Sequence, residues 1–377
     1  MKEFDYIILG GGLSGLSLGY ELNKQGCLKN KTLAILEKRK NYKRDKNWSY
    51  WDYDHNAFKN CVIQSWDSFE IKHDNKSIVL PCNKTPYRTI DSKKFYDFII
   101  KDLSKNKNIL LKKDTNIISL KKNVIKTNKG IYKGKYIFDS LLKIPQKQVE
   151  MYQHFYGCEI EVKKNTFNSK SLQLMDFDCE QKNGLHFFYI LPFSKKRALI
   201  ETTWYSKTIK KAEDYQNEIS EYLQKYQIKG KIRYKEFGAI PLCNFPKDPK
   251  ISNYFKIGTA GNMTRISTGY TFQTIQMFSK NLAKELRQTK KISTIKTRSY
   301  KYTFLDQILL SVIQRQYKLM PKIFFNLFKN NNSETVINFL SDKSNFADDI
   351  QIIKSMPKLV FLQNFLIFLF KQIFIKK

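Results

Sequence analysis

The chain begins with an apolar segment and a glycine cluster, Tyr6-Ile-Ile-Leu-Gly10-Gly-Gly12-Leu-Ser-Gly15-Leu-Ser-Leu-Gly19, which is followed by Leu33-Ala-Ile-Leu-Glu37. This is the order of a short strand, a glycine turn, a helix and a second strand that ends in an acid. The same order is typical of the βαβ unit that binds dinucleotides. The sequence therefore predicts a dinucleotide-binding fold for the N-terminal part.

Each glycine has a physical role in such a unit. Gly10 permits the tight turn, Gly12 lets backbone amides approach a pyrophosphate, and Gly15 lets the helix pack close to the sheet. The helix N-terminus directs its positive dipole end at the phosphates. The Glu37 carboxylate can accept hydrogen bonds from ribose hydroxyls, which argues against NADP and leaves FAD and NAD open. The alternative is a purely structural glycine turn.

The charge of the chain points to a polyanionic surface. Its 377 residues include 67 Lys and Arg against 34 Asp and Glu, a formal net charge of +33. The basic residues are spread along the chain, with no dense block beside stacking aromatics, so the pattern favours a membrane surface over nucleic acid. An overall compositional bias toward Lys, Asn and Ile is the alternative explanation.

The cysteine pattern gives no sign of a metal site. The six cysteines occur singly, without a CxxC pair, and the four histidines are scattered. This usage fits a reducing cytosol. We expect no signal peptide, because the chain starts with an apolar strand, and therefore a cytoplasmic cofactor face.

The pattern along the chain predicts an α/β protein. We expect a helix over 92–103 with Ser92 as N-cap, short strands between 109 and 140, mainly β structure over 153–204, and a charged helix over 210–226. We predict a Rossmann-type domain with an inserted, mainly antiparallel β substrate domain and a C-terminal helical region. The predicted parts are 1–150, 151–250, a return to the cofactor domain over 251–300, and a membrane-facing 301–377.

Two further segments resemble binding elements. Residues 255–273 repeat the strand, small-residue turn and helix order, which suits a second phosphate or a flavin ring, although an ordinary connection fits too. The stretch 47–51 places Trp48 and Trp51 either in a ring-lined pocket or in a loop that folds onto the core.

The tail 359–377 lacks the roughly 20 uninterrupted apolar residues of a spanning helix. It fits an interfacial helix or a buried core helix.

Two acids interrupt apolar strands. Glu201 lies in Ala198-Leu-Ile-Glu-Thr-Thr-Trp204, where Leu199, Glu201 and Thr203 share one strand face. Asp176 lies between Met175 and Phe177. A carboxyl in an apolar cavity has a raised pKa and can deliver a proton. A solvent-facing edge position is the common alternative for either residue.

The sequence resembles bacterial lycopene cyclases, flavoproteins that close the ends of a linear carotene, over nearly its whole length. The matching segments are GGGLSG (10–15), NWSYW (47–51), YRTID (87–91), MDF (175–177), HFFYILPFSKKRALIETTW (186–204), GAIPL (238–242) and GTAGNMTRISTGYTF (258–272). The order MDF, YxLPFS and IETT is the most distinctive. Related aromatic hydroxylases carry Gly-Asp where this chain has Gly258-Thr259, which argues against a hydroxylase.

The resemblance implies a set of roles for individual residues. It implies Glu201 as the essential acid, and FAD contacts from Gly10, Gly12, Gly15, Glu37, Gly261, Thr268 and Gly269. We expect a substrate pocket with Trp48, Trp51, Asp176, Trp204 and Tyr270, in which the tryptophans add cation–π stabilisation.

The resemblance also implies the reaction: lycopene β-cyclisation, a non-redox isomerisation that requires reduced FAD, with NAD(P)H as electron donor. It implies a peripheral protein on the cytoplasmic side of the membrane, a linear carotene as substrate, and other carotenoid enzymes as partners. The alternatives are a monooxygenase or prenyl-chain reductase of the same fold, and a non-enzymatic nucleotide-binding membrane adaptor.

Overall fold

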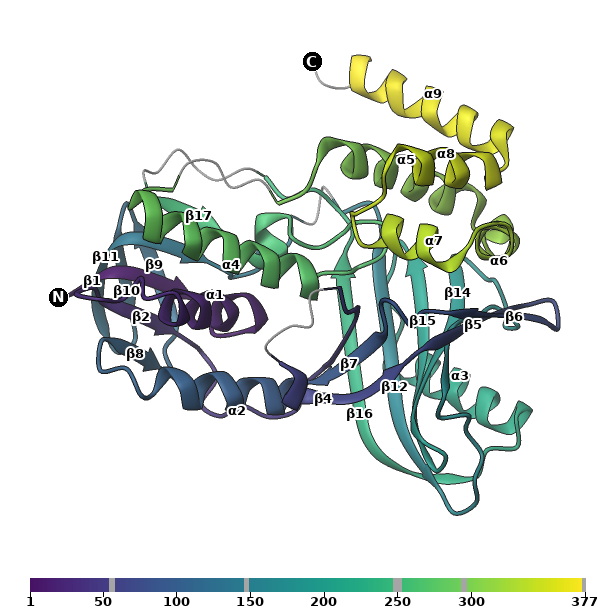
Figure 1. Cartoon of the computed structure of the whole chain (residues 1–377), viewed down its shortest axis with the longest axis horizontal. Coiled ribbons are helices and arrows are strands. Elements are labelled where there is room, and N and C mark those ends of the chain that lie inside the picture. Colours follow the sequence, from purple (N-terminus) through teal and green to yellow (C-terminus); the bar gives the residue numbers. More distant parts are fainter. Residues whose placement is uncertain (54–57, 146–148, 247–252, 293–296, 375–377) are drawn as a thin grey trace.

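The computed structural model describes residues 1–53, 58–145, 149–246, 253–292 and 297–374, and describes side chains up to residue 370. Figure 1 shows a cofactor-type α/β part beside a large, mainly antiparallel sheet in which, among its described strands, only β13 and β5 pair in parallel, with a helical region above that sheet. The predicted fold class, a Rossmann-type α/β domain with an antiparallel β part and C-terminal helices, is confirmed. The end of the predicted tail, 375–377, lies outside the described residues.

The first sheet has the strand order β8-β2-β1-β11-β10-β9, and β17 pairs with β11. Its core strands β8, β2, β1 and β11 are parallel, and the apolar residues of β2 and of the second half of β1 are buried. The helices α1, α2 and α4 pack around it. The elements are β1 (Lys2–Leu9), α1 (Leu13–Lys24), β2 (Leu33–Leu36), α2 (Ser92–Leu103), β8 (Ile109–Lys112), β9 (Ile117–Lys121), β10 (Val124–Thr127), β11 (Gly130–Asp139), β17 (Tyr254–Lys256) and α4 (Phe272–Thr289).

The start of α2 corrects one detail of the sequence analysis. The helix begins at Ser92, as predicted, but its N-cap is Asp91, whose carboxylate accepts hydrogen bonds from the backbone amides of Lys93 and Lys94. Ser92 instead accepts hydrogen bonds from the backbone amides of Asp45 and Lys46. An aspartate at the N-cap satisfies free helical N–H groups as well as serine does.

The second sheet has the order β16-β12-β15-β14-β13-β5-β6. Helix α3 covers one face, and the C-terminal helices cover the other (Figure 1). The strands β5 and β6 come from within the first predicted part, 1–150, so the chain enters the second sheet earlier than residue 151. The elements are β5 (Ser68–His73), β6 (Lys76–Pro81), β12 (Tyr152–Val162), β13 (Ser171–Asp176), β14 (Leu185–Ser194), β15 (Arg197–Ser206), α3 (Ala212–Lys225) and β16 (Gly230–Pro241).

A small sheet and a helical region complete the fold. The small sheet, in the order β3-β7-β4, lies at the junction of the two larger parts (Figure 1). Its strands are β3 (Asn47–Trp51), β4 (Val62–Trp66) and β7 (Tyr87–Asp91). The helical region contains α5 (Tyr300–Gln316), α6 (Met320–Asn330), α7 (Ser333–Leu340), α8 (Phe346–Ser355) and α9 (Lys358–Phe374). Short 3-10 turns occur at Lys59–Cys61, Gly258–Gly261 and Tyr317–Leu319.

Two glycines at the turn between β1 and α1 differ in the space around them, and this difference can be tested. A Cβ atom at Gly15 would lie 1.9 Å from the carbonyl oxygen of Gly10, whereas at Gly12 the nearest atom, Arg39 Nη2, is 3.9 Å away. We expect Gly15→Ala to lower the free energy of unfolding by at least about 2 kcal/mol, because the helix must move off the sheet. Gly12→Ala is the matched control and should leave the urea midpoint nearly unchanged. Equal midpoints for the two variants would contradict this account.

Candidate functional site

One large cavity of about 940 Å³ joins the three parts of the molecule. It runs from the N-terminus of α1, past the face of the second sheet, to the helices α8 and α9. Gly12 and Ser14 line it at the cofactor end, Glu201 lines it along the sheet, and Phe361 and Phe365 line it at the helical end. The fold thus places a dinucleotide-type turn and the acid of β15 on a common cavity.

The cofactor end is built from backbone. Gly10 has φ +91°, a conformation that favours glycine, and it lies behind the wall next to Ser140. Gly12 and Gly258 line the cavity itself, and Gly258 also has a positive φ, +68°. The N-terminus of α1 has no side-chain cap and lines the cavity, an arrangement whose amides and helix dipole suit an anion.

Glu37 holds this turn from behind. Its carboxylate accepts hydrogen bonds from the backbone amides of Gly11, at 2.6 Å, and Arg39, at 2.7 Å, and it does not line the cavity. Arg39 donates to the Gly11 carbonyl, at 2.9 Å, and does line the cavity. Sequence reasoning did not select Arg39. Its position two residues after the predicted ribose-binding acid was the available signal.

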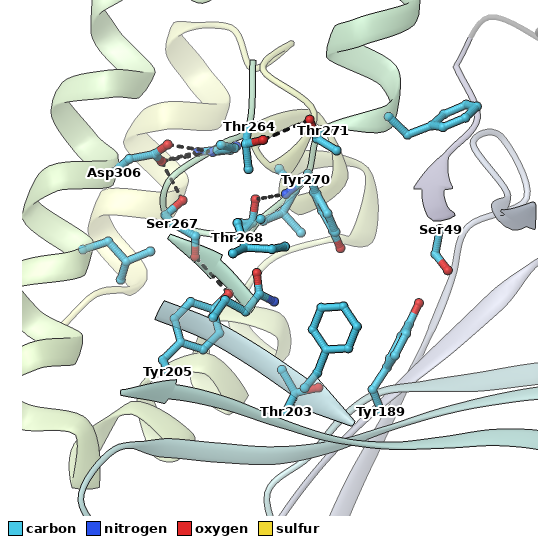
Figure 2. A pocket seen from close by; sticks show the side chains of 18 of the residues that line it. Ser49, Tyr189, Thr203, Tyr205, Thr264, Ser267, Thr268, Tyr270, Thr271 and Asp306 are labelled. Carbon is cyan, nitrogen blue, oxygen red and sulfur yellow. Dashed lines mark hydrogen bonds and ion pairs between the residues drawn. The ribbon is translucent and has the colours of Figure 1, made fainter. Parts of the chain in front are cut away.

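A second turn, 264–271, lies opposite the sheet. Figure 2 shows Thr203 and Tyr205 rising from the sheet toward Thr268 and Tyr270 of this turn. Thr268, Gly269 and Tyr270 line the cavity, and Gly269 has φ +71°. A Cβ atom at Gly269 would lie 1.9 Å from Gln153 Oε1, so the Gln153 side chain from β12 lies directly against this turn.

Gly261, predicted beside the flavin, does not line the cavity. It lies in the 3-10 turn after β17, where a Cβ atom would meet the Lys256 carbonyl oxygen at 2.4 Å. The structure therefore gives Gly261 a packing role that keeps the 258–261 turn tight.

A buried ion pair fixes the second turn to the helical region. Arg265, which is 1% exposed, pairs with the carboxylate of Asp306 on α5, at 3.0 Å, and with that of Asp342, at 3.3 Å. Ser267 donates to Asp306 at 2.7 Å, as drawn in Figure 2. The Tyr205 hydroxyl donates to the Ser267 carbonyl at 3.2 Å, which links the turn to β15.

Glu201 points from β15 into the cavity together with Thr203 and Tyr205, and alternation had predicted that it shares a strand face with Thr203. Its side chain is buried, and Thr203 Oγ1 donates to Glu201 Oε1 at 2.9 Å. Burial raises the pKa of Glu201 well above its ordinary value, and the charge of Glu236 raises it further, whereas the Thr203 hydrogen bond lowers it. The structure thus places a carboxyl with a raised pKa against a largely apolar space.

Comparison with protein families identifies the chain. The model of the family described as lycopene cyclase protein matches residues 5–365. The chain belongs to the lycopene cyclase family. A comparison with curated proteins gives no match.

Several solved structures share the fold of this lycopene cyclase family member, and three of them are described as different kinds of protein. A geranylgeranyl bacteriochlorophyll reductase-like protein from Thermoplasma acidophilum has 13% identity and a TM-score of 0.64, and the match covers 96% of this chain and 98% of that one. A flavoprotein/dehydrogenase from Cytophaga hutchinsonii has 11% identity, a TM-score of 0.63, and coverages of 90% and 93%. A probable FAD-dependent monooxygenase from Pseudomonas aeruginosa has 9% identity, a TM-score of 0.58, and coverages of 85% and 97%. At these identities the likeness establishes the fold.

The structure brings some of the predicted pocket residues of this family member together and separates others. Trp48 and Tyr270 line the cavity, whereas Trp51, Asp176 and Trp204 do not. Trp51 is packed in the core against Tyr87, with ring centroids 4.5 Å apart. Trp51 is an odd number of residues from Trp48, so on a strand the two side chains point to opposite faces.

Trp204 and Asp176 face helix α3 on the far side of the sheet. Trp204 stacks on His186 at 4.0 Å and donates its Nε1–H to Glu218 at 3.0 Å. Asp176 accepts hydrogen bonds from Tyr222 and Tyr226. Trp204 lies three residues after Glu201, so alternation on β15 excludes it from the face that Glu201 shares. The placement of Trp51, Trp204 and Asp176 in the pocket is therefore corrected.

Aromatic rings from other positions line the cavity. They are Tyr87, Tyr96, Phe155, Phe187, Tyr189, Tyr205, Phe272, Phe324, Phe328, Phe339, Phe361 and Phe365. Burial raises the pKa of Tyr189 and Tyr205, so both phenols stay neutral. Within the described ranges, no group of three or more His, Cys, Asp and Glu side chains forms a metal site.

The Arg265–Asp306 pair gives a stability test. We expect Asp306→Asn to lower the free energy of unfolding by about 3 kcal/mol, because a buried guanidinium loses its main counter-charge. Urea unfolding measures the change. Asp97→Ala, which removes the exposed ion pair with Lys93, is the control and should leave the midpoint nearly unchanged. An Asp306→Asn midpoint equal to that of the control would contradict the anchoring role.

Proposed function

We propose that this chain is a lycopene β-cyclase that closes the ends of lycopene, through γ-carotene, to β-carotene with no net oxidation or reduction. The observation that carries the proposal is the buried Glu201, whose pKa burial raises, on the wall of a large apolar cavity in a member of the lycopene cyclase family.

Glu201 supplies the proton that starts the reaction. Proton transfer to a terminal double bond of the carotene leaves a tertiary carbocation, and the neighbouring double bond attacks it to close a six-membered ring. A ring proton then leaves, and a new double bond forms, so the atoms of the substrate are conserved. The Glu201 carboxylate left by the first step is the nearest base to receive that proton. Thr203, which donates to Glu201, holds the carboxyl in place.

The cavity walls favour this chemistry over capture of the cation by water. Apolar side chains from the sheet and the C-terminal helices line most of the cavity, which limits the contact of water with a bound cation. The neutral rings of Tyr189, Tyr205 and Tyr270 take the cation–π role that the sequence had assigned to Trp51 and Trp204. Trp48 keeps that role because it lines the cavity.

The cofactor end fits FAD. Gly12 leaves room for a pyrophosphate beside the N-terminus of α1, and Arg39 brings a positive charge to the same wall. Gln153 Oε1, at the second turn, is buried and accepts no hydrogen bond from the part of the chain that the structure describes. An N–H group of a flavin ring would satisfy it. Gly12, Arg39, Gln153 and the 268–270 turn would hold the cofactor, with Gly10, Gly15 and Glu37 supporting them from behind.

When bound at this end of the cavity, reduced FAD would supply negative charge, which would stabilise a developing cation electrostatically. We propose NAD(P)H as the source of the electrons, because the flavin must be reduced once and the cyclisation itself consumes none. The proteins that deliver or receive carotenes, other carotenoid enzymes, are proposed partners.

The helical end of the cavity fits attachment to the cytoplasmic side of a membrane. In α9, Leu359, Leu362, Leu366 and Phe370 are exposed on one stripe, while Asn364 and Phe365 face α5. Phe361, Leu362 and Phe365 also line the cavity, so the stripe borders its mouth. A hydrocarbon substrate dissolved in a bilayer can enter there, and the charge of +33 attracts anionic lipids.

No single helix among the described residues is long and apolar enough to cross a membrane; α8 and α9 meet that standard only together, as a pair bent by 110°.

The acid role of Glu201 predicts the behaviour of one variant. We expect Glu201→Gln to lower the rate of lycopene cyclisation at least about a hundredfold, because the amide has no acidic proton to give. FAD absorbance should be retained. The control is Glu218→Gln, the same change on the far face of the sheet. Undiminished cyclisation by Glu201→Gln with full FAD would contradict the proposed function.

The membrane role of α9 predicts a second outcome. We expect Leu359→Glu with Leu366→Glu to weaken binding to anionic liposomes about tenfold or more, because two apolar contacts with the interface are replaced by charges. Flotation measures the bound fraction. The control is Ile118→Glu, at an exposed position on β9 far from the cavity mouth. Binding of the α9 variant equal to that of the control would exclude this surface as the attachment site.

A further inference from the structure

A second buried carboxyl lies next to Glu201 and has no role so far. Strand β12 runs between β15 and β16, and Gly157 on β12 pairs with Glu201 on one side and with Glu236 on the other. Residues directly opposite in antiparallel strands put their side chains on the same face. The two glutamates therefore flank a residue that has no side chain.

This arrangement lets the two carboxyls interact. Two strand spacings separate their backbones by about 9–10 Å, a gap that two glutamate side chains span from both sides. A Cβ atom at Gly157 would lie 3.3 Å from Glu236 Cγ and 3.5 Å from Glu201 Oε2. Both side chains are buried, at 8% exposure for Glu201 and 6% for Glu236. Glu201 lines the cavity and Glu236 does not.

Glu236 is held as an acceptor. Asn47 donates its backbone N–H to Glu236 Oε2 and its side-chain Nδ2–H to Oε1, both at 2.9 Å. Arg44 in turn donates to Asn47 Oδ1 at 2.9 Å. Two directed donors on separate oxygens favour the ionised form of a carboxyl. Among the described residues, Glu201 by contrast accepts a hydrogen bond only from the Thr203 hydroxyl.

We propose that Glu236 is a positioning residue that remains ionised and keeps the proton on Glu201 between turnovers, across the gap left by Gly157. This proposal rests on the proposed function, in which Glu201 is the acid. The pair holds one proton, which stays mainly on Glu201. Glu236 exchanges no proton with the substrate.

The charges around the pair agree with this assignment. Glu236 from β16, Lys46 from the segment before β3 and Tyr189 from β14 face Glu201, while Arg44, Lys46 and Tyr234 face Glu236. Burial raises the pKa of Glu236, but Asn47, Arg44 and Lys46 all oppose that rise. For Glu201 both burial and Glu236 act in the same, upward direction.

The charge of Glu236 determines the direction in which the pH–rate profile should move. Cyclisation needs protonated Glu201, so activity falls as pH rises through the pKa of Glu201. Glu236→Gln removes the charge that raises this pKa, and the alkaline limb of the pH–rate profile should move about one unit or more to lower pH. Glu236→Asp keeps the charge and should restore the limb toward the wild-type position. Glu218→Gln should leave it in place.

A second measurement does not depend on turnover. Infrared difference spectroscopy follows the C=O band of protonated Glu201 as pH rises, and the loss of that band in Glu201→Gln assigns it. The band should disappear at lower pH in Glu236→Gln than in the wild type. An unchanged band and limb in folded Glu236→Gln, or a shift to higher pH, would overturn the proposal. Failure of the wild type to cyclise lycopene would instead refute the proposed function, while the infrared titration would still decide the coupling.

Discussion

The arrangement of the other parts of the molecule depends on the burial of one carboxyl group, that of Glu201, against an apolar cavity. A charged glutamate is costly to hold away from water, so burial raises the pKa of Glu201, and in the proposed function the same apolar surroundings protect a carbocation. The cavity has to be closed by the sheet below and by the helices above. The fold therefore brings a dinucleotide-type turn, an acid and many apolar side chains to the wall of one cavity.

The interactions that assemble these parts are polar and buried. Arg265 and Asp306 tie the 264–271 turn to α5, and Tyr205 ties the same turn to the strand that carries Glu201. On the far face of that strand, the Trp204–Glu218 contact fastens α3. Glu201 thus lies beside a turn that buried polar contacts hold in place, and in the proposed function this turn helps to position the proton donor.

Local sequence patterns predicted much of this and failed where long-range pairing decides. The βαβ unit, the helix at 92–103 and the strand face that Glu201 shares with Thr203 all follow from periods within short segments. The entry of β5 and β6 into the second sheet, the Arg265–Asp306 pair and the meeting of Glu201 with Glu236 depend on residues far apart in the chain, which no local period encodes. Trp204 is different: alternation along β15 already placed it on the wrong face, and its aromatic character had outweighed that geometry.

The most direct test of the central claim is a mass measurement on the product formed from lycopene in liposomes, with FAD kept reduced, in H2O and in D2O. The account predicts a product of unchanged mass in H2O and one retained deuterium for each ring in D2O, because the acid's proton exchanges with solvent and remains on the ring. A product heavier in H2O by two hydrogens or by an oxygen would contradict the account and identify a reductase or a monooxygenase.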